Sequence, residues 1–185
     1  WEAVPDAIRY AVTLTSTETL KADTRVKVIS DDFAKVTEGT LENIEFGRSQ
    51  EELDAYTHNP GWYGVAHGFA AGYMVLAPYS GSATLTTPEL NLTSDNGAFT
   101  LNIKMAEGAY GKFYSGGKVT VNLYNDDPNA EGFKGAPVET KTVDLTKDDF
   151  DTYTVSFSKG VVASYVQISY ISEDGRKLYI DEMSI

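Results

Sequence analysis

Short runs of alternating apolar and polar residues, separated by turns, dominate the sequence from residue 68 to its end. Alternation with a period of two gives each strand one apolar face for a core. Many short strands of this kind predict an all-β fold built as a two-sheet antiparallel sandwich. Eight runs qualify as strands: Gly68–Leu76, Ala83–Leu90, Ala98–Met105, Gly117–Tyr124, Val138–Leu145, Thr152–Ser158, Ser164–Ile171 and Lys177–Ile185.

The last run, Lys177–Ile185, changes its apolar phase in the middle. Its apolar residues share one face before Asp181–Glu182 and the opposite face after them. A change of phase without a turn residue predicts a β-bulge or a bend at these two acids. The turn-forming segment before this run, Ser172–Lys177, is typical of a hairpin that joins the last two strands.

One short helix is expected over Ser49–Tyr56. Ser49 and Glu52 have the spacing of a capping box, and His58–Gly61 contains the proline and glycine that end a helix. Residues 1–25 form a separate segment, which is either a first strand or the remnant of a preceding domain. The spacing of apolar residues in Trp1–Leu14 resembles the early strands of a fibronectin type III domain. We expect residues 26–185 to form the sandwich.

The charge and composition limit the classes of partner. The chain carries a formal net charge of -12, which argues against nucleic acid and anionic lipid as ligands because both require clustered Lys and Arg. No cysteine is present, so neither disulfides nor thiolate metal sites can form. No apolar run is long enough for a membrane span, so we expect no membrane insertion of this domain. Neutral glycans, protein partners or a cation remain compatible.

Aromatic and amide side chains in the predicted turns are candidate ligand-binding residues. Trp62 and Tyr63 lie in a glycine- and proline-containing turn, Tyr114 lies in the connection before residue 117, and Asn125 opens an Asp- and Asn-rich loop. An exposed ring at such a place can stack on a sugar or anchor a protein partner. The alternative is that Trp62 folds back over the core, and the same alternative holds for the ring of Tyr114.

Acidic residues near the two ends of the sandwich are candidate calcium ligands. Asp31 and Asp32 enter the main body, and Asp181 lies in the last strand, which is often a neighbour of the first. Calcium binds carboxylate and carbonyl oxygens, so such a convergence could hold the ion. The alternative is that these acids are solvated at strand ends.

Catalysis has little support in the sequence. His58 and His67 are the only histidines, and no Gly-x-Ser-x-Gly motif is present. Asp181 and Glu182 are adjacent in a strand, so their side chains point to opposite faces unless a bulge rotates them, and they make a poor glycosidase pair. We therefore expect a protein that is not an enzyme.

Three passages together resemble the cleaved-adhesin and choice-of-anchor modules of bacterial surface proteins, which are similar in architecture to MAM domains and many carbohydrate-binding modules. The resemblance implies a jelly-roll sandwich of galactose-binding or concanavalin-like architecture. It also implies a structural Ca²⁺ at Asp31 or Asp32 and Asp181, although the acid-rich loop of cleaved-adhesin modules is missing after the first strand. The passages are Val28–Phe33, Leu85–Leu92 followed by Gly97–Leu101, and Tyr153–Phe157 leading to Leu178–Ile185.

The resemblance and the residues together favour a non-catalytic carbohydrate-binding or adhesion module of a secreted or cell-surface bacterial protein. Its expected partner is a glycan or a surface protein, bound near Trp62, Tyr63, Tyr114 and Asn125, and we expect it to be monomeric. Two alternatives stay open. One is a structural or protein-interaction spacer beside other domains, and the other is a hydrolase domain that gathers His58 or His67 with carboxylates.

Overall fold

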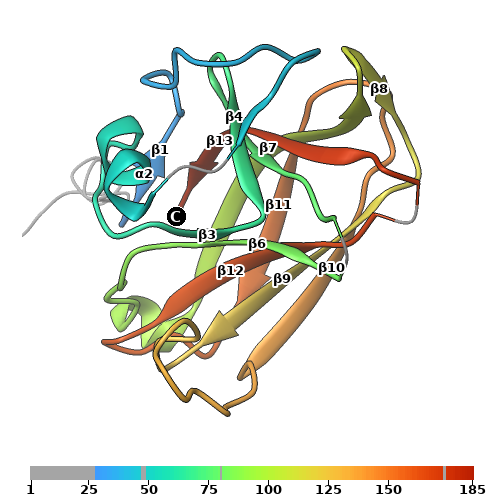
Figure 1. Cartoon of the computed structure of the whole chain (residues 1–185). Helices are drawn as coiled ribbons and strands as arrows, with labels where there is room; N and C mark the ends of the chain where they lie inside the picture. Colours follow the sequence, from blue (N-terminus) through green and yellow to red (C-terminus); the bar gives the residue numbers. More distant parts are fainter. Residues whose placement is uncertain (1–27, 47–48, 80, 173) are drawn as a thin grey trace, which may run out of the picture.

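The computed structural model describes residues 28–46, 49–79, 81–172 and 174–185, which form two antiparallel sheets that share one apolar core (Figure 1). The smaller sheet has five strands, and all of its neighbouring strands are antiparallel. This confirms the predicted all-β sandwich. In spatial order the five strands are β10 (Glu139–Asp144), β9 (Lys118–Tyr124), β12 (Tyr165–Tyr170), β6 (Ala83–Thr86) and β3 (Tyr63–Val65).

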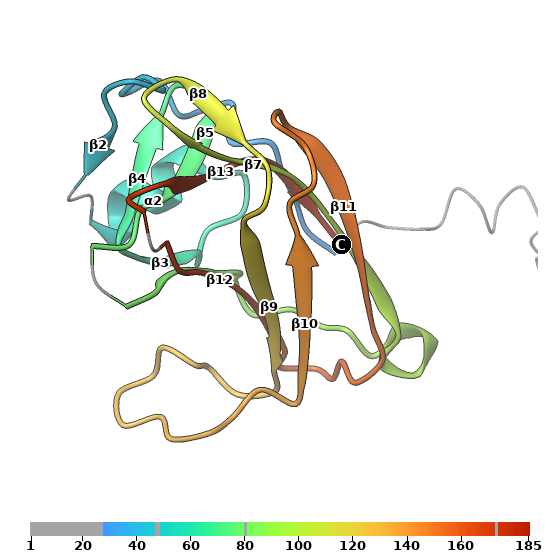
Figure 2. The same ribbon diagram turned by 90° about the vertical axis from the view of Figure 1, so that its right-hand side faces the viewer.

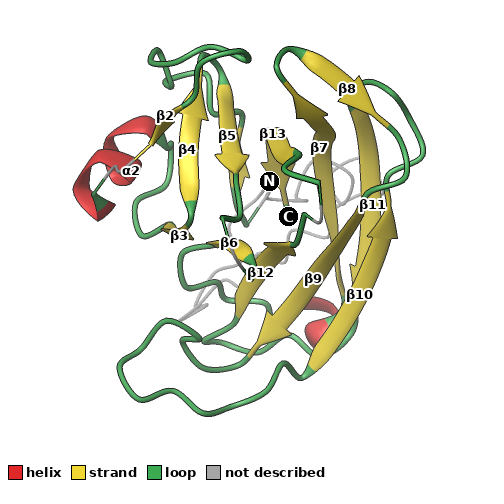
Figure 3. Ribbon diagram, turned by 45° about the vertical axis from the view of Figure 1, so that its right-hand side comes forward, coloured by secondary structure: helices red, strands yellow, loops and turns green. Residues whose placement is uncertain are grey.

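The larger sheet has eight strands. Two of them lie off its main path: β1 (Ser30–Asp31) pairs with β13, and β8 (Lys112–Tyr114) pairs with β7. Figure 3 shows both sheets, with the one α-helix of the described residues at the edge near β2 and β4. The main path runs β11 (Asp151–Phe157), β7 (Phe99–Ala109), β13 (Lys177–Ser184), β5 (Tyr73–Leu76), β4 (His67–Ala70) and β2 (Glu45–Phe46).

Alternation along the long strands builds the core between the sheets. The predicted inward residues of β9 and β12 are fully buried, as are those of β7 except Phe99, which is half-buried, whereas the residues between them in β9 and β12 are half-buried or exposed. The period of two is a property of the extended backbone, which explains why the sequence predicted these faces. The inward residues are Leu101, Ile103 and Met105 in β7, Val119, Val121 and Leu123 in β9, and Val166, Ile168 and Tyr170 in β12.

The closing strand β13 contains the predicted irregularity. Its register against β7 shifts between Ile180 and Glu182, so Asp181 is the extra residue of a β-bulge. The predicted hairpin before it is wrong, because β12 and β13 belong to different sheets. The turn in Ser172–Lys177 instead carries the chain from the five-stranded sheet to the eight-stranded one.

The helix α2 (Gln50–Tyr56) begins with the predicted capping box. The Ser49 hydroxyl accepts a hydrogen bond from the backbone N–H of Glu52, and the Glu52 carboxylate accepts one from the backbone N–H of Ser49. Leu53 is fully buried against the core, so the helix caps one edge of the sandwich. A short 3-10 turn over Ser94–Gly97 precedes β7.

The expected segment 1–25 lies outside the described residues, so its assignment stays a prediction, as does the boundary at residue 26. No helix of the described part is long and apolar enough to cross a membrane. Figure 2 shows the connection between β9 and β10 as a long loop that projects beyond the sheets. This loop begins at Asn125, one of the predicted ligand-binding residues.

Candidate functional site

Trp62 is the predicted ligand-binding residue that the structure excludes from the surface. Its side chain is fully buried, and its ring packs edge-on against Phe33 with the centroids 5.7 Å apart. Of the two alternatives left open by the sequence, the structure shows the one in which Trp62 folds back over the core, so an exposed Trp62 ring is ruled out. The reason is strand phase: Trp62 directly precedes β3, whose first residue Tyr63 points outward, so the preceding side chain points inward. The Trp62 Nε1 atom has no hydrogen-bond partner among the described residues.

Tyr63 lies instead in an exposed apolar depression, which we call the aromatic hollow. The hollow has a volume of about 560 Å³ and lies where the edge of the five-stranded sheet meets the ends of β2, β4 and β5. Tyr63 is 41% exposed, and Tyr79 is fully exposed. The lining residues are Phe46, Tyr63, Gly64, Val65, Ala66, His67, Ala77 and Tyr79.

His67 is the one ionisable imidazole in this hollow. Its Nε2 atom is buried and has no hydrogen-bond partner in the part of the chain that the structure describes. Burial lowers the pKa of His67, which keeps the imidazole neutral near pH 7. Gly64 leaves room for the ring, because a Cβ atom there would lie 2.5 Å from His67 Nδ1. The aromatic hollow is thus predominantly apolar and uncharged.

The outer face of the five-stranded sheet continues from the aromatic hollow. Residues paired across neighbouring strands point to the same face, so the pairing register defines rows of side chains. Two such rows cross all five strands without an ionisable group other than the Tyr63 phenol. One row is Tyr63, Thr86, Gln167, Asn122 and Thr140, of which Thr86 is fully buried, and the other is Val65, Thr84, Ser169, Thr120 and Thr142.

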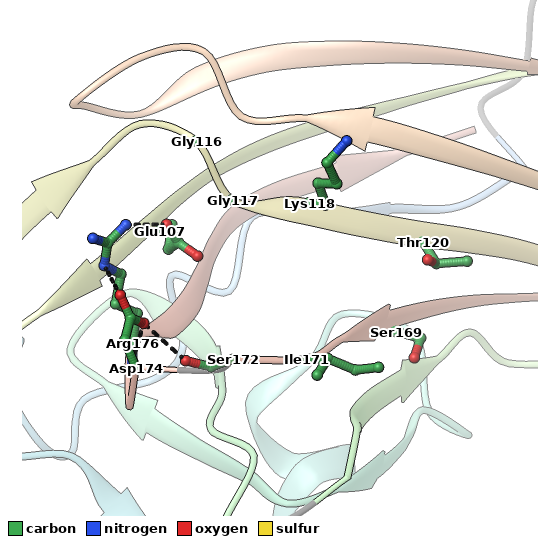
Figure 4. Close-up of a pocket in the computed structure, with 10 residues that line it drawn as sticks. All are labelled: Glu107, Gly116, Gly117, Lys118, Thr120, Ser169, Ile171, Ser172, Asp174 and Arg176. Carbon is green, nitrogen blue, oxygen red and sulfur yellow. Dashed lines mark hydrogen bonds and ion pairs between the residues drawn. The ribbon is translucent and has the colours of Figure 1, made fainter.

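A second depression, which we call the Glu107 hollow, opens at the far side of this face (Figure 4). It has a volume of about 490 Å³, and β9 and β12 contribute Thr120 and Ser169 to it. Figure 4 shows the charged group of Glu107, Arg176 and Asp174 at one end, and Thr120 and Ser169 toward the other. The lining residues are Glu107, Gly116, Gly117, Lys118, Thr120, Ser169, Ile171, Ser172, Asp174 and Arg176.

Glu107 is a buried carboxylate whose oxygens are both bonded. The Tyr170 hydroxyl donates to Oε1 at 2.6 Å, and the Arg176 guanidinium donates to Oε2 at 2.9 Å. Burial, together with this carboxylate, raises the pKa of Tyr170. Gly117 makes room for the carboxylate, because a Cβ atom there would lie 2.4 Å from Glu107 Oε1. The cluster ties the two sheets together where the chain crosses from β12 to β13.

Tyr114 and Asn125 have structural partners. The guanidinium of Arg176 lies 4.5 Å from the centroid of the Tyr114 ring, so this ring is covered by a cation. The Asn125 Oδ1 atom accepts a hydrogen bond from the Ser164 hydroxyl at 3.0 Å, and its Nδ2 donates to the Lys159 carbonyl at 3.3 Å. Neither of these two residues lines the aromatic hollow.

The predicted meeting of Asp31 and Asp32 with Asp181 is not found among the described residues. Asp181 Oδ2 lies 2.6 Å from Lys104 Nζ, in the neighbouring strand β7. His58, instead of Asp181, lies beside Asp31 and Asp32. Its Nδ1 atom is 3.4 Å from Asp31 Oδ1 and 3.5 Å from Asp32 Oδ1. One donor atom from each of these three residues lies within 4.8 Å of the others.

This donor set does not suit calcium. Both oxygens of the buried Asp31 already accept backbone N–H groups, from Phe33 at 3.2 Å and from His58 at 2.7 Å. Asp32 Oδ1 accepts the N–H of Ala34 at 3.0 Å, and the third donor is a nitrogen. Calcium prefers six to eight oxygen ligands. The arrangement fixes the start of the sandwich to the segment after α2, and the calcium site stays an untested expectation.

Sequence reasoning missed most of the two hollows. Tyr79 follows a predicted strand next to a turn, which is a weak signal, and Phe46 lies in a strand of only two residues that the sequence did not predict. Glu107 had a clearer signal, because it extends the inward series of Leu101, Ile103 and Met105 by one further step of two.

Comparison with known proteins supports the fold. No protein-family model and no curated protein matches the sequence. Among solved structures, the K3 cleaved adhesin domain of Lys-gingipain from Porphyromonas gingivalis matches with a TM-score of 0.50 and 12% identity, over 86% of this chain and 96% of that chain. This similarity confirms the predicted resemblance in fold to cleaved-adhesin modules.

Two further similarities are weaker. A family 29 carbohydrate-binding module complexed with mannohexaose matches with a TM-score of 0.43 and 18% identity, over 66% of this chain and 76% of that chain. The enzymatically active domain of tailspike protein 4 of bacteriophage CBA120 matches with a TM-score of 0.40 and 12% identity, over 60% of this chain and 15% of that chain. At these TM-scores neither similarity carries an inference about this chain.

Proposed function

We propose that this chain is a non-catalytic carbohydrate-binding or adhesion module that holds a glycan in the aromatic hollow. The observation that carries the proposal is the exposure of Tyr63 and Tyr79 around one depression of about 560 Å³. Ligand pockets in proteins have volumes of about 300–1,000 Å³ and combine apolar walls with a few polar groups. The two phenol hydroxyls supply such polar groups beside apolar ring faces.

The surroundings of the hollow suit a neutral ligand rich in hydroxyl groups. The hollow shares Tyr63 and Val65 with an outer sheet face of hydroxyl and amide side chains. The net charge of the chain, -12, disfavours polyanions. The fold is shared with a cleaved adhesin domain, which agrees with a role as a binding module. The similarity itself concerns the fold alone. Secretion or a bacterial cell-surface location, and a monomeric state, are parts of the proposal that await experiment.

A glycan array probed with the fluorescently labelled chain tests the proposal, with Tyr79→Ala as the informative variant. We expect binding to neutral glycans and a loss of at least about tenfold in affinity in Tyr79→Ala, because exposed aromatic anchors dominate small binding sites. Tyr110→Ala is the matched control, since Tyr110 is also exposed but lies outside both hollows. Silence of the wild type on the array, or equal losses in the two variants, would refute the proposal.

A protein-interaction spacer is the first alternative, because the exposed apolar residues of the aromatic hollow could also contact a protein. This alternative predicts that the chain binds no glycan on the array. It also predicts that the chain binds itself or a defined neighbouring domain, and that Tyr79→Ala weakens this binding.

A hydrolase is the second alternative, and the contact of His58 with Asp31 and Asp32 is the observation that favours it. Against it, both Asp31 oxygens are held by backbone N–H groups, which gives this carboxylate a structural role. Loss of hydrolysis of an array glycan in His58→Gln would support the hydrolase. Unchanged array glycans after prolonged incubation would count against it.

A further inference from the structure

We propose that the bound glycan is an extended, uncharged chain that crosses the strands of the five-stranded sheet, from the aromatic hollow to the Glu107 hollow. The inference rests on the proposed function and specifies its ligand. It concerns how the two hollows are connected, whereas the proposed function requires only the first of them.

The pairing register connects the two hollows directly. Val65 lines the aromatic hollow, and Ser169 and Thr120 line the Glu107 hollow. These residues belong to one row, with only Thr84 of β6 between Val65 and Ser169. Neighbouring strands lie about 4.8 Å apart, so Val65 and Ser169 are about 10 Å apart at the backbone, and Val65 and Thr120 about 14 Å. A short linear oligosaccharide can span such a distance.

The side chains between the two hollows are small enough for a glycan chain to lie across them. Thr84, Ser169 and Thr120 are all half-buried, and none of them is large enough to form a ridge between the hollows. The cationic side chains, Lys118 and Arg176, lie outside this row, in the Glu107 hollow. A flat path between two depressions favours an internal segment of a chain over a single terminal sugar.

The adjacent row supplies amides that face the same path. Asn122 Oδ1 accepts a hydrogen bond from the Thr140 hydroxyl at 2.8 Å, and Gln167 Nε2 donates to the Thr86 hydroxyl at 3.2 Å. These contacts orient both amides. Within the described residues, Asn122 Nδ2 and Gln167 Oε1 form no hydrogen bond. One donor and one acceptor are therefore held ready for sugar hydroxyls.

The charges along the path disfavour an anionic glycan. Lys118 Nζ lies 3.0 Å from Asp144 Oδ1, and Arg176 is paired with both Glu107 and Asp174. Both cations at the polar end are thus neutralised by their own partners. An acidic sugar would compete with these carboxylates for the two cations, whereas a neutral sugar can use the hydroxyls of Thr120 and Ser169 without doing so.

Isothermal titration with mannohexaose, cellohexaose and xylohexaose, and with the shorter members of each series, tests the inference. We expect at least one series to bind with an affinity that rises about tenfold or more from the disaccharide to the hexaose and then levels off. Thr84→Arg should block the path and lower the hexaose affinity to that of the disaccharide. Circular dichroism and melting curves confirm that this surface variant is folded.

Asn122→Ala and Asn102→Ala form a matched pair of variants. Asn102 accepts a hydrogen bond from the Thr154 hydroxyl at 2.9 Å, as Asn122 does from Thr140, but it lies on the other sheet. A hydrogen bond contributes about 0.5–1.5 kcal/mol, so Asn122→Ala should weaken hexaose binding about three- to tenfold. Asn102→Ala should leave it unchanged, and the disaccharide should be insensitive to both variants.

The outcomes separate this inference from the proposed function. Equal affinities for disaccharide and hexaose, equal effects of Asn122→Ala and Asn102→Ala, or no binding of any of the three hexaoses would overturn the inference. If the glycan array nevertheless shows binding that depends on Tyr79, the proposed function stands. If the array is silent as well, both fail.

Discussion

Replacing Tyr170 by Phe removes one hydroxyl group from the junction between the two sheets. This hydroxyl donates a 2.6 Å hydrogen bond to the buried Glu107 carboxylate, whose other oxygen is bonded to Arg176. A hydrogen bond to a charged group contributes about 1.5–3 kcal/mol, and the remaining Arg176 contact keeps Glu107 from being unpaired. We therefore expect Tyr170→Phe to lower the free energy of unfolding by about 2 kcal/mol.

Tyr165→Phe is the matched control for this change. Tyr165 belongs to the same strand, and its hydroxyl donates to the Glu89 carboxylate at 3.1 Å, but this pair is exposed. Because water replaces the lost partner at an exposed site, the expected loss is below about 1 kcal/mol. The two variants thus make the same chemical change beside the same type of acceptor and differ mainly in burial.

Urea denaturation followed by fluorescence and circular dichroism measures both losses. For a chain of this size, 1 kcal/mol corresponds to about 2–4 °C, so Tyr170→Phe should lower the melting temperature by about 4–8 °C. A Tyr170→Phe loss no larger than that of Tyr165→Phe would refute the reasoning. A double variant with Glu107→Gln adds a further check, because the two changes should be non-additive if they remove one interaction.

Two further predictions concern protons and metal ions. Burial lowers the pKa of His67 below its ordinary value of 6.5, so the stability linked to neutral His67 is complete above that value and is lost as the pH falls toward the lower folded pKa. The melting temperature should fall as the pH drops from about 6.5 to about 5. The fall should be smaller in His67→Phe than in His58→Gln, and equal slopes in the two variants would contradict this. Since Asp31, Asp32 and His58 do not suit calcium, EDTA should leave the melting temperature unchanged, whereas a decrease that CaCl2 reverses would support the sequence-based calcium expectation.

The strand faces could be predicted from the sequence because they depend on backbone periodicity. The series Val119, Val121 and Leu123 is buried as its alternation indicates, and the change of phase at Asp181 marks a real bulge. The partner of a strand could not be predicted in the same way. The turn in Ser172–Lys177 looks like any hairpin turn, because turn chemistry fixes a local change of direction and does not specify which sheet the next strand joins.

The site residues were harder to predict, because exposure depends on tertiary neighbours. Trp62 and Tyr63 are adjacent and chemically similar, yet one is fully buried and the other lines the aromatic hollow. Tyr63 begins strand β3, which is only three residues long, so the sequence carried little signal for which of the two side chains points inward. Asp181 was expected to meet Asp31, but its nearest cation, Lys104, belongs to the strand β7 that only the sheet order brings beside it.

Glu107 shows how one inward acid can shape a surface as well as a core. An ionised carboxylate at a core position must be fully bonded, and Tyr170 and Arg176 supply these bonds from the other sheet and from the crossing segment. Arg176 is thereby drawn over the ring of Tyr114, and its charge is neutralised before any ligand arrives. Each cation that lines the polar end of the sheet face is therefore paired with a carboxylate of the chain itself. If the sheet face binds a glycan as we propose, these internal ion pairs would let a strongly acidic chain accept an uncharged ligand there.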